Sequence, residues 1–440
     1  MKRFLIETWG CQMNIHDSEK ISGMLSALGY IPAPSPEQAD LILLNTCSIR
    51  EKAAEKIFSR LGQLRPLKRT NPDLLLGVCG CVAQQEGESI FRRAPYVDLV
   101  MGPRSLSQLS ALLDQARRDG RSIGLIRDDE PFVSDAGPVV RQSGPRAYVT
   151  VMEGCNKSCT YCIVPYTRGR EVYRSAAEIL SEVRALTGQG YHEIEFLGQN
   201  VNAYHHGIDD LSSLLRMADR VPGVRRLRFT TSHPGHLKRS IMNAMRDVPS
   251  VCNHLHLPVQ SGSDRVLQRM RRGYTRALYQ DKIALLRRMI PDIALSTDLI
   301  VGFPGETEDE FTQTLDLVLQ VEFDQIYAFT FSPRPGTPAA DFEEALPDDV
   351  KQERLARLFA LQESIQQRRN QALIGRTFDL LLDAPSRLDG LPAWKGRTRC
   401  NRIVHVTTDS GSVGRFIKTR IVRAHGHSFA GEPISEAEVA

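Results

Sequence analysis

Alternation of short apolar strands with amphipathic helices is the feature of this 440-residue sequence that most constrains its fold. Strands that alternate with helices along a chain form parallel sheets covered by helices. The first 123 residues therefore predict an N-terminal parallel α/β domain. Its expected strands are 3–9, 39–46, 74–78 and 97–101, and its expected helices include 17–28 and 50–64.

The same alternation returns between residues 147 and 374. Six strand–helix units in succession are typical of an open, partial (β/α)6 barrel. The last helix is expected to be long, from 348 to 374. The predicted strands are 147–152, 193–197, 226–230, 254–257, 294–301 and 325–331.

Two other segments lack this alternation. Residues 124–146 mix Pro, Gly, Ser and charges without periodicity, which predicts a linker. Residues 376–440 contain short strand patterns between Gly- and Ser-containing turns, which predicts a small β-barrel. The whole chain is therefore expected to be α/β, with domains at 1–123, 147–374 and 376–440. The strands expected in the small barrel are 377–382, 402–406 and 416–424.

Composition excludes few functional classes. The net charge is only +4, which argues neither for nor against a nucleic-acid partner. The first residues do not resemble a signal peptide, and no apolar run is long enough to cross a bilayer. We expect a cytoplasmic protein without a membrane partner. Its nine cysteines are then expected to be reduced and available for metal, not paired as disulfides.

Three cysteines follow successive predicted strands of the N-terminal domain. Cys11 follows the first strand, Cys47 the second, and Cys81 comes shortly after the third. Ligands of open parallel sheets bind beyond the carboxyl ends of the strands, so these thiols are expected to converge. Convergent thiolates suggest an iron–sulfur cluster with one open iron. A buried cysteine used as a small apolar side chain is the alternative for any one of them, but not for all three.

The three isolated cysteines have simpler interpretations. Cys79 lies two residues before Cys81, so in an extended strand both would point to the same face. Cys79 could therefore compete with Cys81 as the third ligand. Cys252 and Cys400 have no spacing partners and are expected to be inert thiols.

A second group of three cysteines lies in one short loop. Cys155, Cys159 and Cys162 have the spacing C-x3-C-x2-C. Three thiolates this close can bind three irons of a [4Fe–4S] cluster and leave the fourth iron open to a small molecule. A structural zinc site is the alternative, but zinc favours paired C-x2-C motifs and four ligands.

Several stretches together resemble the methylthiotransferase family of radical S-adenosylmethionine (SAM) enzymes, over nearly the whole chain. The resemblance implies an N-terminal methylthiotransferase domain, a radical SAM partial barrel and a C-terminal TRAM domain. Gln12 and Met13 after Cys11 are similar to the bacterial branch that acts on tRNA; the branch that acts on a ribosomal protein tends to have Cys-Pro-Lys-Asn there. The main stretches are ETWGCQMNIHDSE (7–19), NTCSIRE (45–51), EGCNKSCTYCIVPYTRGRE (153–171), HLPVQSGSDRVLQRMRRGYTR (256–276) and STDLIVGFPGETEDEF (296–311).

The resemblance implies an enzyme with two [4Fe–4S] clusters and SAM as cofactors. Cys155, Cys159 and Cys162 would ligate the cluster that cleaves SAM to a 5′-deoxyadenosyl radical. Cys11, Cys47 and Cys81 would ligate an auxiliary cluster that presents sulfur. The reaction would be methylthiolation at C2 of N6-isopentenyladenosine next to the tRNA anticodon. Such an enzyme needs a reducing electron donor and a sulfur donor, and the sequence leaves both open.

Further SAM contacts are expected at the carboxyl edge of the barrel strands, where active sites of such barrels lie. Asn200 could instead cap a helix, Asp298 could pair within the barrel, and His233 is expected only as a pocket residue. The candidate SAM-binding residues are Tyr161, Gln199, Asn200, Ser232, Asp298 and Gly302.

Basic residues gather near the C-terminus. Residues 384–423 contain nine Lys and Arg but only two Asp and no Glu, and small β-barrels with basic faces commonly bind RNA. A solvated basic face is the alternative. The other functional hypotheses are methylthiolation of threonylcarbamoyl-adenosine tRNA or of a ribosomal protein, and a non-catalytic iron–sulfur RNA-binding sensor. The candidate RNA-binding residues are Arg397, Arg399, Arg402, Lys418 and Arg420.

Overall fold

The computed structural model describes residues 1–48, 53–125, 137–141, 144–409 and 411–434. The chain forms two compact units. The first comprises Met1–Gln142, Met152–Lys157 and Cys162–Val172, and the second comprises Ser143–Val151, Ser158–Tyr161 and Tyr173–Ala440. Most of the expected linker and the start of the expected helix 50–64 lie outside the described residues. The three domain boundaries stay a prediction.

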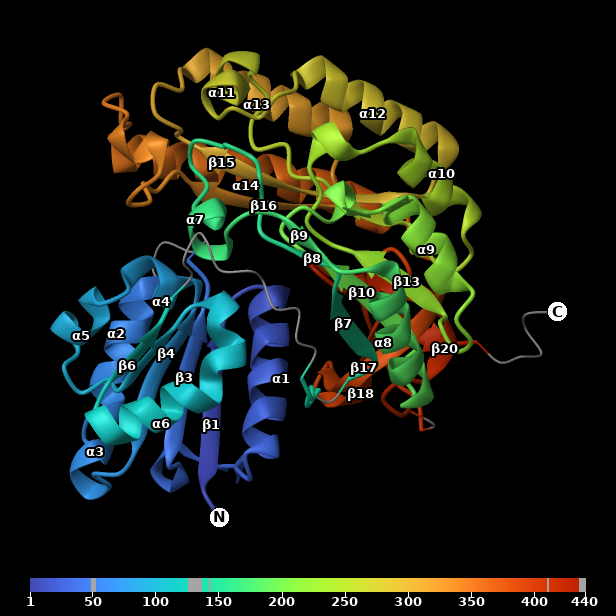
Figure 1. Cartoon of the computed structure of the whole chain (residues 1–440). Helices are drawn as coiled ribbons and strands as arrows, with labels where there is room; N and C mark the ends of the chain where they lie inside the picture. Colours follow the sequence, from blue (N-terminus) through green and yellow to red (C-terminus); the bar gives the residue numbers. More distant parts are fainter. Residues whose placement is uncertain (49–52, 126–136, 142–143, 410, 435–440) are drawn as a thin grey trace. The chain divides into compact units, whose positions relative to one another are not determined.

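The first unit is built on a six-stranded sheet in the order β2-β1-β3-β4-β5-β6, with every pair parallel (Figure 1). This confirms the parallel α/β domain. The strand order reverses between β1 and β3, and ligands of such sheets bind at this switch point. The strands are β1 (Arg3–Trp9), β2 (Ile31–Pro32), β3 (Leu41–Thr46), β4 (Leu75–Gly80), β5 (Leu99–Met101) and β6 (Ser122–Gly124).

Helices cover both faces of this sheet. Alternate residues of β3 point to opposite faces: Leu41 and Leu43 belong to the core under α1 and α6, and Ile42 and Leu44 to the core under α2, α4 and α5. Burial on both faces explains why β3 is apolar throughout. The helices are α1 (Gln12–Ala27), α2 (Ala53–Leu64), α3 (Leu67–Thr70), α4 (Cys81–Glu86), α5 (Ser89–Arg93), α6 (Leu109–Asp119) and α7 (Val164–Arg168).

The second unit contains six parallel strands in two sheets, β7-β10-β13 and β14-β15-β16. A parallel bridge between Leu227 of β13 and Val251, just before β14, joins the two sheets. This arrangement confirms the open (β/α)6 barrel (Figure 1). Its strands are β7 (Arg146–Thr150), β10 (Glu193–Leu197), β13 (Arg226–Phe229), β14 (His254–His256), β15 (Ala294–Val301) and β16 (Gln325–Thr330).

Helices follow the barrel strands, and a longer helix precedes the C-terminal strands. The last helix ends at Gln371, three residues before the predicted end at 374, and Gly375, with φ of 83°, lies in the turn beyond it. The helices are α8 (Ala176–Gly188), α9 (Leu211–Asp219), α10 (Arg239–Asp247), α11 (Asp264–Arg269), α12 (Arg276–Met289), α13 (Glu308–Val321) and α14 (Asp348–Gln371).

The C-terminal residues form a closed five-stranded barrel in the order β17-β18-β19-β21-β20, which confirms the small β-barrel. The sequence interpretation missed β18 and β21. Asp389 and Gly390 have φ of 51° and 82° between β17 and β18, and an Asp-Gly pair with two positive φ values is a hairpin signal that could have revealed β18. The strands are β17 (Thr377–Leu388), β18 (Leu391–Arg397), β19 (Ile403–Val406), β20 (Phe416–Ala424) and β21 (Phe429–Pro433).

Two buried arginines of β13 join the open barrel to the small barrel. Arg226 donates to the carbonyls of Arg397 (2.8 Å) and Asp379 (2.6 Å). Arg228 donates to the carbonyls of Arg399 (2.9 Å) and Thr398 (2.7 Å). Buried cations need such partners, so the small barrel completes the polar contacts of β13.

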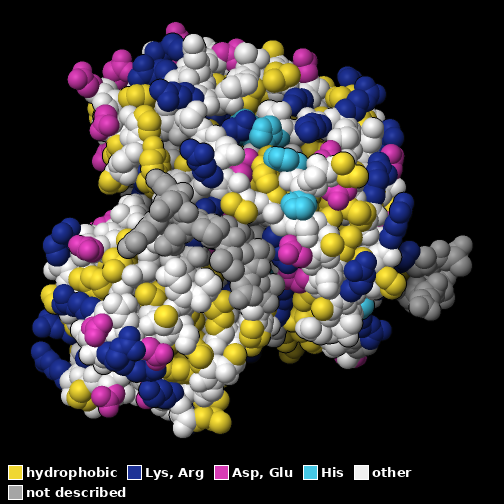
Figure 2. Space-filling model, in the orientation of Figure 1, with side chains coloured by type: hydrophobic (Ala, Val, Ile, Leu, Met, Phe, Trp, Pro, Cys, Tyr) yellow, Lys and Arg dark blue, Asp and Glu magenta, His cyan; other side chains and the backbone are white. Residues whose placement is uncertain are grey.

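Charge is distributed over the surface. On the face that Figure 2 shows, Lys and Arg side chains are spread among Asp and Glu side chains. No helix in the described part of the chain is both long enough and apolar enough to cross a membrane.

Candidate iron–sulfur sites and SAM pocket

Three neighbouring parallel strands end at Cys11, Cys47 and Cys81. Cys11 is the N-cap of α1 two residues after β1, Cys47 directly follows β3, and Cys81 is the first residue of α4 after β4. The three thiols lie within electrostatic reach of one another. Burial raises the pKa of Cys11 to about 11, and Cys81 and Cys47 add to that rise. The structure thus brings this group of cysteines to one sheet edge.

Cys79 lies apart from this group. It belongs to the hydrophobic core with Leu99 and Met101, and burial raises the pKa of its thiol. Gly80 separates Cys79 from Cys81 with φ of 89° and ψ of −161°, which interrupts the alternation of an extended strand. A Cβ on Gly80 would lie 2.4 Å from Asn45 Oδ1, so only glycine fits. Cys81 as the third ligand stays a prediction, and this geometry favours it over Cys79.

Helix α1 begins five residues earlier than the sequence predicted, and the reason lies at Cys11. The Asn14 side chain accepts a hydrogen bond from the Cys11 backbone N–H at 3.3 Å and donates to Asn45 of β3 at 3.2 Å. These buried amides fix the helix start against the sheet. The start of α1 in turn fixes the position of Cys11.

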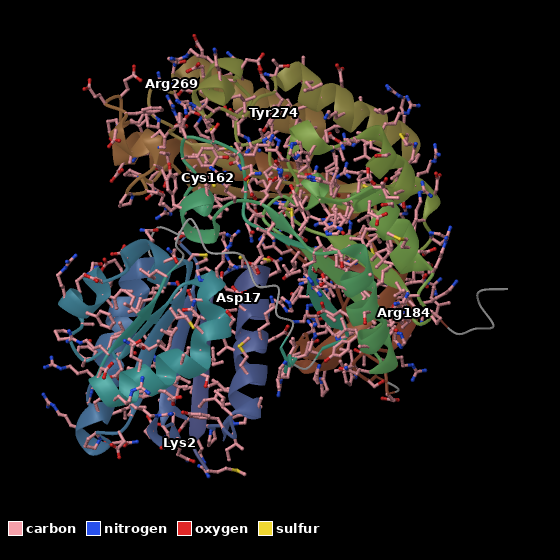
Figure 3. The ribbon with its side chains drawn as sticks, viewed as in Figure 1. Lys2, Asp17, Cys162, Arg184, Arg269 and Tyr274 are labelled. Atoms are coloured by element: carbon pink, nitrogen blue, oxygen red, sulfur yellow. The ribbon has the colours of Figure 1, made fainter. Side chains whose placement is uncertain are left out.

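A buried cation lies beside this group. Arg168 at the end of α7 pairs with Asp17 of α1 at 2.6 Å, and each side chain is 2% exposed (Asp17 is labelled in Figure 3). Burial raises the pKa of the Cys81 thiol, and the positive charge of Arg168 opposes that rise. A guanidinium stays charged in proteins, so Arg168 favours thiolates here. The sequence analysis missed Arg168; its position in the Thr-Arg-Gly-Arg run after the second cysteine group was the available signal.

The loop of the second group is divided between the units: Cys155 and Cys162 belong to the first, and Cys159 to the second. The Cys155 N–H donates to the Gly169 carbonyl at 3.0 Å. Cys162 lies two residues before the first residue of α7 (Figure 3).

Cys159 also has a buried arginine partner. Arg272 donates from Nη1 to Cys159 Sγ at 3.5 Å. Arg272 is itself held by the Pro258 carbonyl and the Tyr274 hydroxyl, each at 3.0 Å. Arg272 is thus placed to donate a hydrogen bond to the Cys159 sulfur when that sulfur binds iron. The sequence analysis missed this residue too.

Thiolates are the usual ligands of iron–sulfur clusters, and both cysteine groups offer them. Among the residues that the structure describes, no three His, Cys, Asp or Glu side chains are grouped closely enough to hold one metal ion. A [4Fe–4S] cluster instead takes each thiolate on a different iron, so its ligands stand farther apart. A positive side chain beside the thiols stabilises the negative charge of an iron–sulfur cluster that is bound by thiolates.

The loops after β10 and β13 are tied together at the barrel edge. Asn202 donates to the His233 carbonyl at 2.9 Å and accepts from the His233 N–H at 2.8 Å. Asn200 contacts His236 through its side-chain nitrogen at 3.1 Å. Among the described residues, the buried Ser232 hydroxyl has no hydrogen-bond partner. An unsatisfied buried hydroxyl at this edge suits a contact to a bound cofactor.

Backbone strain marks the same edge. Thr231 after β13 and Gln260 after β14 have φ of 73° and 74°, which are uncommon for residues other than glycine. Such conformations cluster at binding sites, where the surrounding structure holds them.

The remaining SAM candidates have different surroundings. Asp298 lies 3.4 Å from His256 Nε2, and Tyr161 packs against a buried cluster that contains Phe303. Gly302 has φ of 69°, and a Cβ there would lie 2.3 Å from Lys351 Cγ. Packing against Lys351 therefore explains why position 302 requires glycine. Gln199 directly precedes Asn200 at the same edge, and its role stays a prediction.

The five RNA candidates divide into two groups. Arg402 pairs with Asp324, Arg399 donates to the carbonyls of Pro249 and Val251 (both 2.7 Å), and Arg397 lies 3.4 Å from Asp383. These three hold protein groups within the second unit. Lys418 and Arg420 of β20 have exposed side chains.

An open barrel of six parallel strands that carries C-x3-C-x2-C after its first strand defines a radical SAM enzyme. The family model "Radical SAM superfamily" matches residues 149–318, and "Uncharacterized protein family UPF0004" matches residues 3–102. The solved structure of the radical SAM methyltransferase TsrM from Kitasatospora setae has the same fold: its TM-score is 0.57 at 14% identity, over 77% of this chain and 75% of that chain.

Curated relatives make the assignment more specific. The chain is 46% identical to the tRNA-2-methylthio-N(6)-dimethylallyladenosine synthase of Paraburkholderia phymatum, over 98% of this chain and 97% of that protein. It is 47% identical to that of Chromobacterium violaceum, over 99% of each. The chain belongs to the tRNA-2-methylthio-N(6)-dimethylallyladenosine synthase family of radical SAM enzymes. This confirms the resemblance seen in the sequence and favours the tRNA hypothesis over the alternatives.

Proposed function

We propose that the protein methylthiolates C2 of N6-isopentenyladenosine next to the anticodon of tRNA, with two [4Fe–4S] clusters and SAM as cofactors. The observation that carries this proposal is the meeting of Cys11, Cys47 and Cys81 at the ends of β1, β3 and β4. Three thiols that meet at one sheet edge, separate from the C-x3-C-x2-C loop, support a second cluster. The names of the curated relatives, which are tRNA-2-methylthio-N(6)-dimethylallyladenosine synthases, support tRNA as the substrate.

Each cysteine group has a defined role in this proposal. Cys155, Cys159 and Cys162 hold one cluster, and Cys11, Cys47 and Cys81 hold the other. When bound, the clusters and SAM supply the radical that removes hydrogen from C2 and the sulfur that replaces it. Arg272 donates to the sulfur of Cys159, and the charge of Arg168 opposes the rise that burial gives the pKa of Cys81, so each cysteine group has a guanidinium beside it.

The barrel edge holds SAM in this proposal. Ser232 offers its buried hydroxyl, Asn200 and Gln199 offer amides, and Asp298 offers a carboxylate that can accept from the ribose hydroxyls. Tyr161, within the cysteine loop, packs beside the same region. Gly302 has a packing explanation of its own, so its role toward SAM is the weakest of the set.

Partners follow from the chemistry. Lys418 and Arg420 are the candidate residues that remain exposed for tRNA phosphates. Reductive cleavage of SAM requires an electron donor, and each turnover requires a sulfur donor. A partner tRNA implies a cytoplasmic location.

A deletion strain tests the function directly. Its tRNA should contain N6-isopentenyladenosine without the 2-methylthio group, as measured by mass spectrometry of nucleosides. The wild-type gene and a Cys400→Ala variant should restore the group, whereas Cys11→Ala should not. A complemented strain whose tRNA stays unchanged, while a ribosomal protein gains the modification, would show that the target is a protein.

A further inference from the structure

Strand β16 exposes two large aromatic side chains on one face. Its residues alternate: Ile326 and Ala328 are buried on the face toward α14, whereas Tyr327 is 42% and Phe329 is 47% exposed. Residues two apart in a strand share a face, so both rings point to the same side.

That side is the interior of the open barrel. The Tyr327 ring lies edge-on to His256 of β14, with ring centroids 5.8 Å apart. Burial raises the pKa of Tyr327, and the charge of Asp298 on β15 adds to that rise. The positive charge of Arg397 opposes that rise, and the charge of Glu195 on β10 adds to it.

The interior around these rings divides by polarity. Register pairs Tyr327 with Asp298, and His256 lies beside both. Register pairs Phe329 with Ile300, so this end of the face is apolar. Ile300 packs against the same buried cluster as Tyr161, so the apolar end of the face lies toward the cysteine loop.

The interior of a (β/α) barrel is normally filled by its own side chains. Here two aromatic rings are left uncovered inside the barrel, next to candidate cofactor residues. Bases stack on aromatic faces with about 1–3 kcal/mol each, whatever their sequence. An adenine that carries a branched apolar N6 group needs both a stacking surface and an apolar contact.

We propose that Tyr327 and Phe329 bind the target nucleoside: Tyr327 stacks on the purine, and Phe329 and Ile300 contact its N6-dimethylallyl group. This inference rests on the proposed function and adds the residues that select the modified adenosine. The polar surroundings of Tyr327 suit the edges of the purine, and the apolar surroundings of Phe329 suit the hydrocarbon. Phe329 thus determines specificity for adenosine that is already N6-modified.

Binding of two anticodon stem–loop RNAs to the reconstituted enzyme tests this. One RNA carries N6-dimethylallyladenosine and the other carries adenosine at the same position. Phe329→Ala should weaken binding of the modified RNA ~10-fold and leave the unmodified RNA unchanged. Tyr327→Ala should weaken the binding of both RNAs by a similar factor. Phe359→Ala on α14, which removes a 44% exposed ring outside the barrel, should change neither.

Three results would overturn the inference. If Phe329→Ala weakens the binding of both RNAs equally, or of neither RNA, Phe329 does not select the N6 group. If Phe329→Ala instead weakens the binding of SAM, measured as the Kd for SAM without RNA, Tyr327 and Phe329 contact the cofactor and not the nucleoside. Phe329→Leu, which keeps an apolar side chain, should lose less than Phe329→Ala; an equal loss also contradicts an apolar contact. If the wild-type enzyme fails to methylthiolate the modified RNA, the proposed function fails, whatever the variants do.

Discussion

Arg168 and Asp17 form a 2.6 Å ion pair from which water is almost completely excluded, each side chain being 2% exposed. They lie 151 residues apart in sequence. Breaking a buried pair by removal of one partner typically costs about 3–5 kcal/mol, because a charge is left without compensation. Asp17 thus holds Arg168 where its charge acts on Cys81 and Cys11. Arg168 is therefore a positioning residue for the first cysteine group.

Arg168→Met should change the electrostatics of the auxiliary cluster. Removal of this positive charge makes the reduced, more negative cluster less stable. Its reduction potential should therefore fall by tens of mV, which corresponds to about 1 kcal/mol for a one-electron couple. EPR-monitored redox titration measures this. Arg184→Met on α8 removes an exposed arginine and should leave both potentials unchanged. Equal potentials in the two variants would show that Arg168 is only structural.

Cys81→Ala and Cys79→Ala should differ in iron content. Cys81→Ala should remove one cluster, so iron per chain should fall from about eight to about four after anaerobic reconstitution. Cys79→Ala removes a buried sulfur from the core, so it should keep the iron and lose about 1 kcal/mol of unfolding free energy. The opposite pattern would make Cys79 the third ligand.

Charge reversal separates RNA contacts from structural arginines in the small barrel. Lys418→Glu should weaken tRNA binding and make its salt dependence shallower by about one unit per lost phosphate contact, without lowering the Tm. Arg402→Gln should instead lower the Tm, because Asp324 then keeps only one of its two arginine partners, Arg369. A Tm that drops only in the Lys418 variant would reverse these roles.

Removal of residues 376–440 should destabilise the open barrel as well as weaken tRNA binding. Arg226 and Arg228 would each lose two carbonyl acceptors while they remain near Glu193. Thermal unfolding of the truncated chain should therefore begin at a lower temperature than that of the full chain. An unchanged transition would show that water replaces these acceptors at little cost.

Gly302→Ala tests whether residue 302 is glycine because Lys351 packs against it or because SAM approaches it. The new Cβ would meet Lys351 Cγ at 2.3 Å in a left-handed backbone, so the unfolding free energy should fall by about 1–2 kcal/mol. In a Lys351→Ala background the backbone strain and the 3.3 Å contact with Cβ of residue 351 remain, and the loss should be smaller. If the affinity for SAM also falls in that background, the glycine serves the cofactor.

Much of the fold was predictable from the sequence by itself. The bounds of Arg3–Trp9, Glu193–Leu197 and Ala294–Val301 were predicted to the residue, because such strands are short runs bounded by turn and cap residues. The meeting of Cys11, Cys47 and Cys81 at one edge was also predictable. It follows from parallel topology, in which every strand end lies on the same side.

The roles of the arginines were decided only by the tertiary structure. Arg399 and Arg402 were expected to face RNA, but they contact Pro249, Val251 and Asp324 within the second unit. Arg168 and Arg272 lie beside thiols in the interior, and the sequence around them does not show that their guanidinium groups are buried. Local patterns determine which residues form a strand or helix. Whether a charge is buried depends on partners that are distant in sequence, and only the folded chain brings those partners together.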